Sequence, residues 1–221
     1  MSRDFNIDTY LPGQIVCVGM NYRSHAKEQD GRFPDKPVLF SKAMGCIIKN
    51  NENIICPHEV KELDYEVELA VIVDKEMHNV PVEKVEDHIY GYTIINDVTA
   101  RDIQRNESQW YRAKSFDTFC PIGPVIVPRW KIIDPNNLFI RSCVNGELRQ
   151  DSNTGDMLLD VYQLLAYISS SITIYEGDLI ATGTPAGVGV FMSKKSFLKD
   201  GDEVVCEIEN IGQLTNKIVY L

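Results

Sequence analysis

The chain has 221 residues, 44% of them hydrophobic and 24% charged, a composition typical of one globular domain with a buried core. Its formal net charge of −10 at pH 7 argues against a nucleic-acid partner, because phosphate would be repelled over most of the surface. No apolar run approaches the roughly 20 residues of a membrane span, and the first residues do not resemble a secretory signal. We therefore expect no membrane association.

The six cysteines are scattered along the chain without a C-x-x-C pair, and most stand in apolar surroundings. This pattern predicts buried, reduced thiols rather than disulfides or a zinc site. Reduced thiols in turn suggest a cytoplasmic location.

Strand-forming residues between Gly, Pro, Asn and Asp dominate the chain and predict a β-rich α+β fold. The expected strands span residues 15–19, 37–42, 69–73, 89–96, 123–128, 138–150, 178–184 and 202–221. Asn145-Gly146 lies between two strand-forming runs and predicts a type I′ hairpin turn.

Helices are fewer. Apolar residues recur at helical spacing over 160–172, where Asp160 can act as the N-cap. Shorter helices are expected at 24–29 and 99–106. Since no repeat, low-complexity tract or long linker interrupts the chain, residues 1–221 are expected to form a single domain. Its first part, 1–14, is expected to be an N-terminal segment.

Two glutamates, Glu66 and Glu68, precede the apolar strand 69–73 in the stretch LDYEVELAVIV. Side chains alternate along a strand, so these carboxylates point the same way, about 6–7 Å apart. Beside a core such a pair is costly, because burial and mutual repulsion oppose ionisation. The pair is either solvated on an exposed face or bound to a hard cation, and the spacing alone leaves both alternatives open.

Asp97 is a third candidate carboxylate, at the point where strand 89–96 stops and a helix is expected to begin. It could accept backbone N–H bonds at the helix start, or it could join the two glutamates. Three oxygen ligands without a nearby His or Cys suit Mg²⁺, Mn²⁺ or Ca²⁺ better than zinc.

Six sequence blocks, in this order, resemble the fumarylacetoacetate hydrolase family, and within it the small acylpyruvases and fumarylpyruvate hydrolases. They are VGMNYRSHAKE (18–28), LDYEVELAV (63–71), NDVTARDIQ (96–104), AKSFDTFCPIGP (113–124), VNGELRQ (144–150) and TGTPAGVG (182–189). The resemblance implies a mixed β-sandwich roll, usually a homodimer, with a divalent cation, Mg²⁺ or Mn²⁺, held at the positions of Glu66, Glu68 and Asp97.

His25 and Glu28 lie three residues apart, on one face of the expected short helix. A carboxylate that binds one imidazole nitrogen fixes the tautomer and makes the other nitrogen more basic. As an isolated pattern the pair also fits a surface contact, but it matches the family's hydrolytic dyad. The resemblance further implies that residues of about 22–36 form a lid over bound ligand.

Four more residues are candidates through the same resemblance. Lys114 would contact the substrate carboxylate or its developing enolate, and would offset the crowded carboxylates. Thr184, in the glycine-rich TGTPAGVG segment, would contact the substrate carboxylate. Gln104 would contact the substrate, whereas Arg101 either binds substrate or orients the acids around the metal.

These assignments predict a hydrolase that cleaves a carbon–carbon bond in a small keto acid, an acylpyruvate such as fumarylpyruvate or acetylpyruvate, and releases pyruvate. The same site could instead decarboxylate or tautomerise oxaloacetate, or isomerise 2-hydroxyhepta-2,4-diene-1,7-dioate. The presence of both His25 and Glu28 favours hydrolysis, since decarboxylation needs no base to activate water. Two other classes stay open, a non-catalytic keto-acid-binding protein and a structural β-domain with solvated acids.

Overall fold

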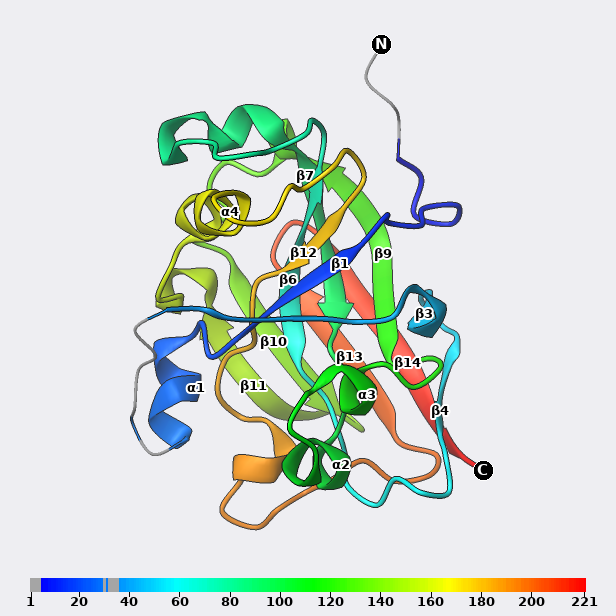
Figure 1. Cartoon of the computed structure of the whole chain (residues 1–221). Helices are drawn as coiled ribbons and strands as arrows, with labels where there is room; N and C mark the ends of the chain where they lie inside the picture. Colours follow the sequence, from blue (N-terminus) through cyan, green and yellow to red (C-terminus); the bar gives the residue numbers. More distant parts are fainter. Residues whose placement is uncertain (1–4, 30, 32–35) are drawn as a thin grey trace.

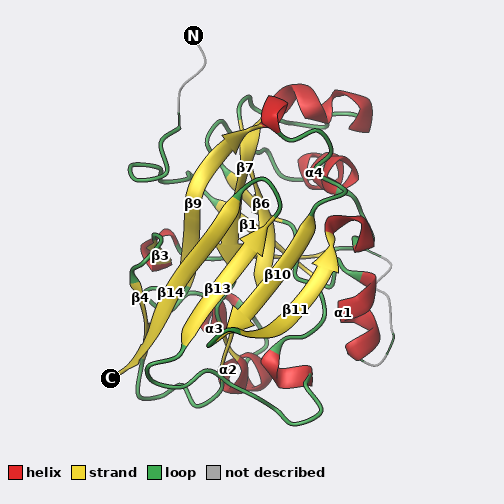
Figure 2. Ribbon diagram, turned by 180° about the vertical axis from the view of Figure 1, so that it is seen from behind, coloured by secondary structure: helices red, strands yellow, loops and turns green. Residues whose placement is uncertain are grey.

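The computed structural model describes residues 5–29, 31 and 36–221. Two large β-sheets pack face to face, with few and short helices around their ends (Figure 1). Strands of one sheet contact strands of the other along the interface, as seen from behind in Figure 2. The expected β-rich α+β class is therefore confirmed.

The larger sheet has seven strands. Their spatial order is β2 (Val38–Ser41), β1 (Ile15–Gly19), β12 (Leu179–Ala181), β6 (Val67–Val73), β7 (Ile89–Asn96), β9 (Cys120–Pro128) and β3 (Ile47–Ile48). The pairs β1–β12 and β3–β9 are parallel and the others are antiparallel, so the sheet is mixed.

The second sheet has five strands. Their order is β11 (Glu147–Asn153), β10 (Phe139–Val144), β13 (Glu203–Ile208), β14 (Gly212–Tyr220) and β4 (Asn53–Cys56). A separate two-stranded ladder joins β5 (Leu63–Asp64) to β8 (Thr99–Ala100). The α-helices are α1 (Arg23–Glu28), α2 (Arg101–Asn106), α3 (Tyr111–Lys114) and α4 (Val161–Ser169).

Strand β6 lies near the middle of the larger sheet and is buried on both faces. Leu69 and Val71 belong to the main core between the sheets, whereas Ala70 and Ile72 belong to a second apolar cluster on the outer face. Phe5 and Ile7 of the N-terminal segment pack against that second cluster. Because strand side chains alternate, Glu68 shares the outer face with Ala70 and Ile72.

Each predicted strand region forms strand, with some changed boundaries: the expected strand 178–184 is limited to Leu179–Ala181, and the expected strand 123–128 begins at Cys120. The short strands β3, β4, β5 and β8 were not predicted. Asn145 and Gly146 have φ values of 52° and 78°, the left-handed pair that a type I′ turn requires, and they join β10 to β11. The expected run 202–221 is two strands rather than one, because a turn at Asn210, with φ 62°, separates β13 from β14.

The helix predictions hold in type and need corrected boundaries. Asp160 caps α4 through a capping box with Gln163, as expected, but α4 ends at Ser169 rather than at 172. Serine hydroxyls at its end bond to carbonyls of the preceding turn, which favours termination there. The helix expected at 99–106 begins at Arg101, because Thr99 and Ala100 pair with β5 instead.

All six cysteines are free thiols and five of them are buried, as predicted. Among the described residues, no helix combines the length and the apolar composition needed to cross a bilayer. Part of the expected lid, residues 30 and 32–35, lies outside the described residues, so its role stays a prediction.

Candidate active site

Three buried carboxylates converge where β6 begins and β7 ends, near the middle of the larger sheet. Glu66 immediately precedes β6, Glu68 lies on β6, and Asp97 immediately follows β7. Strands β6 and β7 are antiparallel and Val67 pairs with Asn96, so the start of one strand adjoins the end of the other. One oxygen from each carboxylate lies within 4.8 Å of the others, and the residues are only 4%, 2% and 0% exposed. The solvated alternative for these acids is therefore wrong.

We call Glu66, Glu68 and Asp97 the carboxylate cradle. Asp97 does not cap the helix, which begins four residues later with no side-chain cap. Its Oδ1 accepts from the Lys42 ammonium at 2.6 Å and its Oδ2 from Lys114 at 2.5 Å. Lys114 also donates to Glu66 Oε2 at 2.6 Å. These buried ammonium groups offset part of the repulsion among the acids.

Glu66 and Glu68 have opposite electrostatic environments. Burial alone would raise the pKa of Glu66, but Arg101 and Lys114 outweigh it and lower that pKa. For Glu68, burial and then the charges of Asp97 and Glu66 raise the pKa well above its usual range. Among the described residues, Glu68 accepts only the Gly183 N–H, at 2.8 Å, and has no cationic partner within ion-pair distance.

The donor set fits a hard divalent cation. It consists of three carboxylates, it is buried, and one carboxylate lacks a counter-charge. A cation between the three would remove the repulsion that raises the pKa of Glu68. Oxygen ligands alone suit Mg²⁺ or Mn²⁺, and which ion binds stays a prediction.

A second layer of contacts holds the cradle in place through Arg101. Its Nη2 donates to Glu66 Oε1 at 2.5 Å, its Nε to Asp64 Oδ2 at 2.8 Å, and its Nη1 to Gln104 Oε1 at 3.0 Å. Asp64 also accepts the backbone N–H groups of Gly189 and Val190. Arg101 thus connects Glu66, through Asp64, to Gly189 of the glycine-rich segment.

Backbone N–H groups of the TGTPAGVG segment donate hydrogen bonds to two carboxyl groups of the protein itself. Gly183 N donates to Glu68 and Gly187 N donates to Glu28 Oε2 at 3.0 Å. The Thr184 hydroxyl donates to Val67 O at 2.9 Å and accepts from Gln150 Nε2 at 2.7 Å. A contact from Thr184 to a substrate carboxylate would therefore come from its backbone N–H.

His25 and Glu28 form the expected contact on α1. His25 Nδ1 lies 2.6 Å from Glu28 Oε1, and Gly187 holds the second oxygen of Glu28. The His25 side chain is 6% exposed, and its ring packs edge-on against Phe191, with ring centroids 5.8 Å apart. The other ring nitrogen of His25, Nε2, lies 2.5 Å from Gln29 Nε2. The Gln29 amide thus occupies the place where a ligand would contact His25 Nε2.

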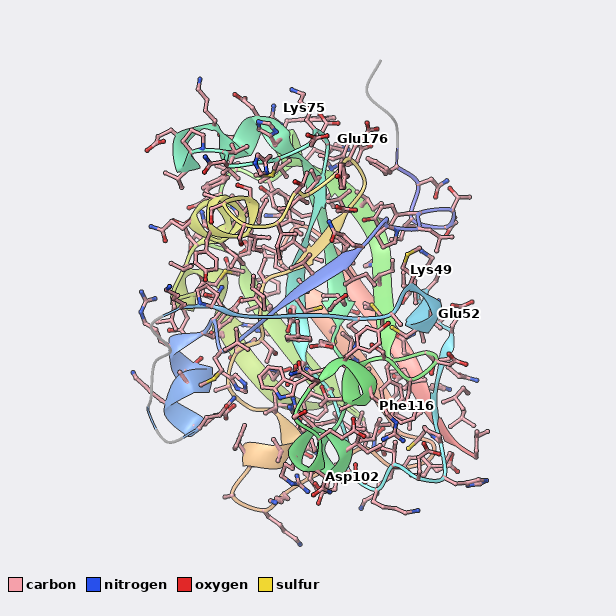
Figure 3. The ribbon with its side chains drawn as sticks, in the orientation of Figure 1. Lys49, Glu52, Lys75, Asp102, Phe116 and Glu176 are labelled. Atoms are coloured by element: carbon pink, nitrogen blue, oxygen red, sulfur yellow. The ribbon has the colours of Figure 1, made fainter. Side chains whose placement is uncertain are left out.

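A cavity of about 260 Å³ brings these groups together. Of the nine predicted residues, Glu28 and Asp97 do not line it. The other seven do: His25, Glu66, Glu68, Arg101, Gln104, Lys114 and Thr184. Phe40 and Trp110 add apolar walls, and Arg105 adds a cation. Arg101, Gln104 and Arg105 of α2 line the cavity. Asp102 of the same helix is labelled in Figure 3, at the end of the molecule opposite to Lys75 and Glu176.

A family model described as the fumarylacetoacetate hydrolase C-terminal domain matches residues 14–219. The chain belongs to the fumarylacetoacetate hydrolase family. It is 52% identical over 213 residues to an uncharacterised protein of Methanocaldococcus jannaschii, covering 96% of this chain and 86% of that protein. A mitochondrial oxaloacetate tautomerase of Bos taurus is 48% identical over 210 residues, covering 94% of this chain and 67% of that protein.

Solved structures of the family agree with the fold. A fumarylacetoacetate hydrolase of Exiguobacterium antarcticum is 45% identical with a TM-score of 0.89, covering 96% of this chain and 77% of that chain. A 2-hydroxyhepta-2,4-diene-1,7-dioate isomerase of Mycobacterium marinum is 41% identical with a TM-score of 0.84, covering 96% and 76%. The expected sandwich roll of this family is thus confirmed.

Sequence reasoning missed two charged residues that contact the site, Lys42 and Asp64, which are 2% and 0% exposed. Lys42 is the last residue of the predicted strand 37–42. A lysine at the end of a strand is usually exposed to solvent, so nothing in the sequence marked it as buried. Asp64 carried a usable signal, because it lies two residues before Glu66 and so continues the alternation of Glu66 and Glu68.

Proposed function

We propose that this chain catalyses keto–enol tautomerisation of oxaloacetate, or of a closely related small 2-oxo dicarboxylic acid, with Mg²⁺ or Mn²⁺ in the carboxylate cradle. The observation that carries the proposal is a buried three-carboxylate cradle facing a glutamate-held histidine across one small cavity. The mitochondrial relative, an oxaloacetate tautomerase by name, supports the choice of reaction.

The charge of the site favours an anionic substrate. Four buried carboxylates, those of the cradle and Asp64, face three buried cations, Lys42, Arg101 and Lys114. With all four carboxylates ionised the cluster carries one net negative charge, and a divalent cation bound to these ionised acids would leave one net positive charge. A keto acid entering the cavity would then meet an attractive field, which a low local dielectric strengthens.

When bound, the cation would polarise the keto oxygen and stabilise the negative charge of the enolate. Arg101 would hold Glu66 in position, and the Thr184 N–H would meet the substrate carboxylate. His25, oriented at Nδ1 by Glu28, would take a proton at Nε2 from the carbon beside the ketone and return it to oxygen. For Nε2 to reach substrate, the Gln29 amide would move aside.

Hydrolysis of an acylpyruvate is the second candidate, and the His25–Glu28 contact is the observation that favours it. In that reaction His25 would activate a water to attack the distal carbonyl, and cleavage would release pyruvate. The sequence placed this reaction first. The named relatives shift the preference to enol chemistry, because they include tautomerases and isomerases.

One panel of assays separates the candidates. Oxaloacetate, acetylpyruvate and fumarylpyruvate would be incubated with Mg²⁺ or Mn²⁺, with enol absorbance and pyruvate release followed in parallel. A tautomerase accelerates loss of enol oxaloacetate without pyruvate, whereas hydrolysis and decarboxylation both release pyruvate. An enol decay rate no faster than that in buffer with metal alone would contradict the proposed reaction.

The oligomeric state, the lid, the cellular location and further substrate contacts remain predictions. A homodimer and a closing lid follow from the resemblance to the family, and a cytoplasmic location follows from the reduced thiols. Gln104 and Arg105 line the cavity and would contact the far end of the substrate.

A further inference from the structure

A second cavity, of about 690 Å³, lies apart from the active site and shares no lining residue with it. Its wall is formed by the segment 192–200 together with Lys61, Arg149 of β11 and Tyr220 of β14. The segment belongs to the orange loop at the lower end of Figure 1. This open cavity, whose lysines are exposed, is large enough to hold a small metabolite.

The charge of this cavity is opposite to that of the whole chain, whose net charge is −10. Five cationic side chains line it against two acids, Glu147 and Asp200; the cations are Lys61, Arg149, Lys194, Lys195 and Lys199. Both acids already have partners. Glu147 pairs with Arg149 at 3.1 Å, and Asp200 accepts the Tyr220 N–H at 2.9 Å.

The lysines have no such compensation. Over the described residues, the ammonium groups of Lys194, Lys195 and Lys199 take part in no ion pair. Like charges gathered around one concavity repel one another, and a bound anion relieves that repulsion.

Arg149 is the most buried of these cations, with its side chain 12% exposed. Its Nε is buried and has no hydrogen-bond partner among the described residues, and its Nη1 meets only Met192 Sδ, at 3.2 Å. A thioether is a weak acceptor. A guanidinium with unused donors is suited to bidentate contact with a phosphate or carboxylate group.

The two cavities are separated by one stretch of chain, 187–192. Val190 and Phe191 line the active site, and the next residue, Met192, lines the second cavity. Gly187 is packed so closely on Arg149 that a Cβ at this glycine would lie 2.1 Å from the Arg149 carbonyl oxygen. The same Gly187 donates its N–H to Glu28, the partner of His25.

We propose that the second cavity is a regulatory site for a small polyanion, a phosphate ester or a polycarboxylate. Arg149 and the lysines of 194–199 bind the anion, and the 187–192 stretch transmits its binding to Glu28 and His25. This site goes beyond the proposed tautomerase activity, because its occupation does not depend on which keto acid the enzyme takes.

The test is a calorimetric titration of the metal-free chain with pyrophosphate and, separately, with citrate. Saturable binding of at least one of them is expected, and its affinity should fall as salt is added. Pyrophosphate alone indicates a phosphate site, and citrate binding indicates a polycarboxylate site. No saturable heat with either anion would overturn the proposal.

Two matched double variants locate the binding. Lys194→Gln with Lys195→Gln removes two charges from the cavity. Lys75→Gln with Lys84→Gln removes two exposed charges that do not line it, and Lys75 is labelled at the far end of the molecule in Figure 3. The first should weaken binding by at least about tenfold and the second should not, because screening limits charge effects to short range. Equal affinities in the two variants, or binding abolished by Lys114→Met alone, would place the anion elsewhere and overturn the proposal.

The regulatory part has its own measurement. At a fixed concentration of free Mg²⁺, the anion should change kcat or KM of the wild type, and the Lys194→Gln/Lys195→Gln variant should need at least about tenfold more anion for the same change. Simple removal of metal by the anion would affect both proteins at the same anion concentration. The same concentration dependence in both proteins, or saturated binding with unchanged kinetics, would overturn the coupling to His25.

Discussion

The carboxylate cradle and the His25–Glu28 pair face the same cavity but are held in place differently. The cradle stands on the adjoining ends of β6 and β7, two neighbouring strands near the middle of the larger sheet. The histidine pair stands on the six-residue helix α1, which is fixed from outside: Asp156 accepts Ser24 N, and Gly187 donates to Glu28.

This difference has a functional consequence. A site on paired strands is fixed by the fold, so its geometry should persist when substrate is absent. A site on a short helix, held by contacts to other loops, can adjust when those loops move. Metal binding should therefore depend on the cradle alone, and turnover on both parts.

The largest effect is expected for Glu68→Gln. This change should abolish Mg²⁺ binding and metal-dependent turnover, since one ligand oxygen and one negative charge are lost. The metal-free variant should be more stable than the wild type by about 1–3 kcal/mol, because the folded wild type must either bury an uncompensated carboxylate or take up a proton that the unfolded chain has released. For a chain of this size, each kcal/mol shifts the melting temperature by about 2–4 °C.

The matched control is Glu176→Gln, an exposed glutamate at the far end of the molecule (Figure 3). It should change neither Mg²⁺ binding nor the melting temperature. If Glu68→Gln bound Mg²⁺ like this control, Glu68 would not be a ligand.

The next largest effect is expected for His25→Asn, which tests the other half of the comparison. Loss of the acid–base group should lower kcat by about 10²–10⁴-fold. Mg²⁺ affinity should stay within about twofold of the wild type, because the cradle does not rest on α1. His78→Asn, an exposed histidine, serves as the control. A parallel loss of metal affinity in His25→Asn would show that the two parts do not act separately.

Lys42→Met tests the support of the cradle. Lys42 is buried and bonds to Asp97, so its loss leaves a buried carboxylate with Lys114 as its remaining cation. We expect a loss of about 3 kcal/mol in the free energy of unfolding without metal, at the lower end for breaking a buried ion pair. Saturating Mg²⁺ should raise the melting temperature more in this variant than in the wild type, because the ion supplies the missing charge. Stability equal to that of Lys75→Met, an exposed change, would contradict this role.

The smallest effect concerns pH. Burial and the neighbouring acids raise the pKa of Glu68, so the folded, metal-free protein binds a proton that the unfolded chain has released. Its stability should therefore fall as pH rises from the usual glutamate range through the raised pKa. Mg²⁺ must displace this proton, so its affinity should drop by up to about tenfold per unit of acidification in the same window. Affinity that is flat across this window would indicate that Glu68 is ionised before the metal arrives.

Strand alternation predicted that Glu66 and Glu68 point the same way, whereas their joint cation site with Asp97 was implied by the resemblance to the family. Glu66 and Glu68 are two residues apart, and Asp97 directly follows the strand 89–96, whose bounds were predicted without error. What was missing was the compensation, since Lys42 meets Asp97 across 55 residues and Asp64 meets Gly189 across 125. No local pattern encodes such distant pairs.

Short elements were also beyond sequence reasoning. Helix α3 is four residues long and carries Lys114, yet four residues give no helical period. Strand β4 and the β5–β8 ladder were missed for the same reason, and the ladder moved the start of α2 to Arg101. Such elements form because tertiary packing fixes them, not because of local propensity.

The most direct test of the central claim is a calorimetric titration of the metal-free chain with Mg²⁺, repeated with Mn²⁺, at neutral pH. The account predicts one ion bound per chain, release of protons on binding, and a rise in melting temperature that Glu68→Gln eliminates. An absence of heat with both ions, together with an unchanged melting temperature, would show that the three buried acids do not form a cation site.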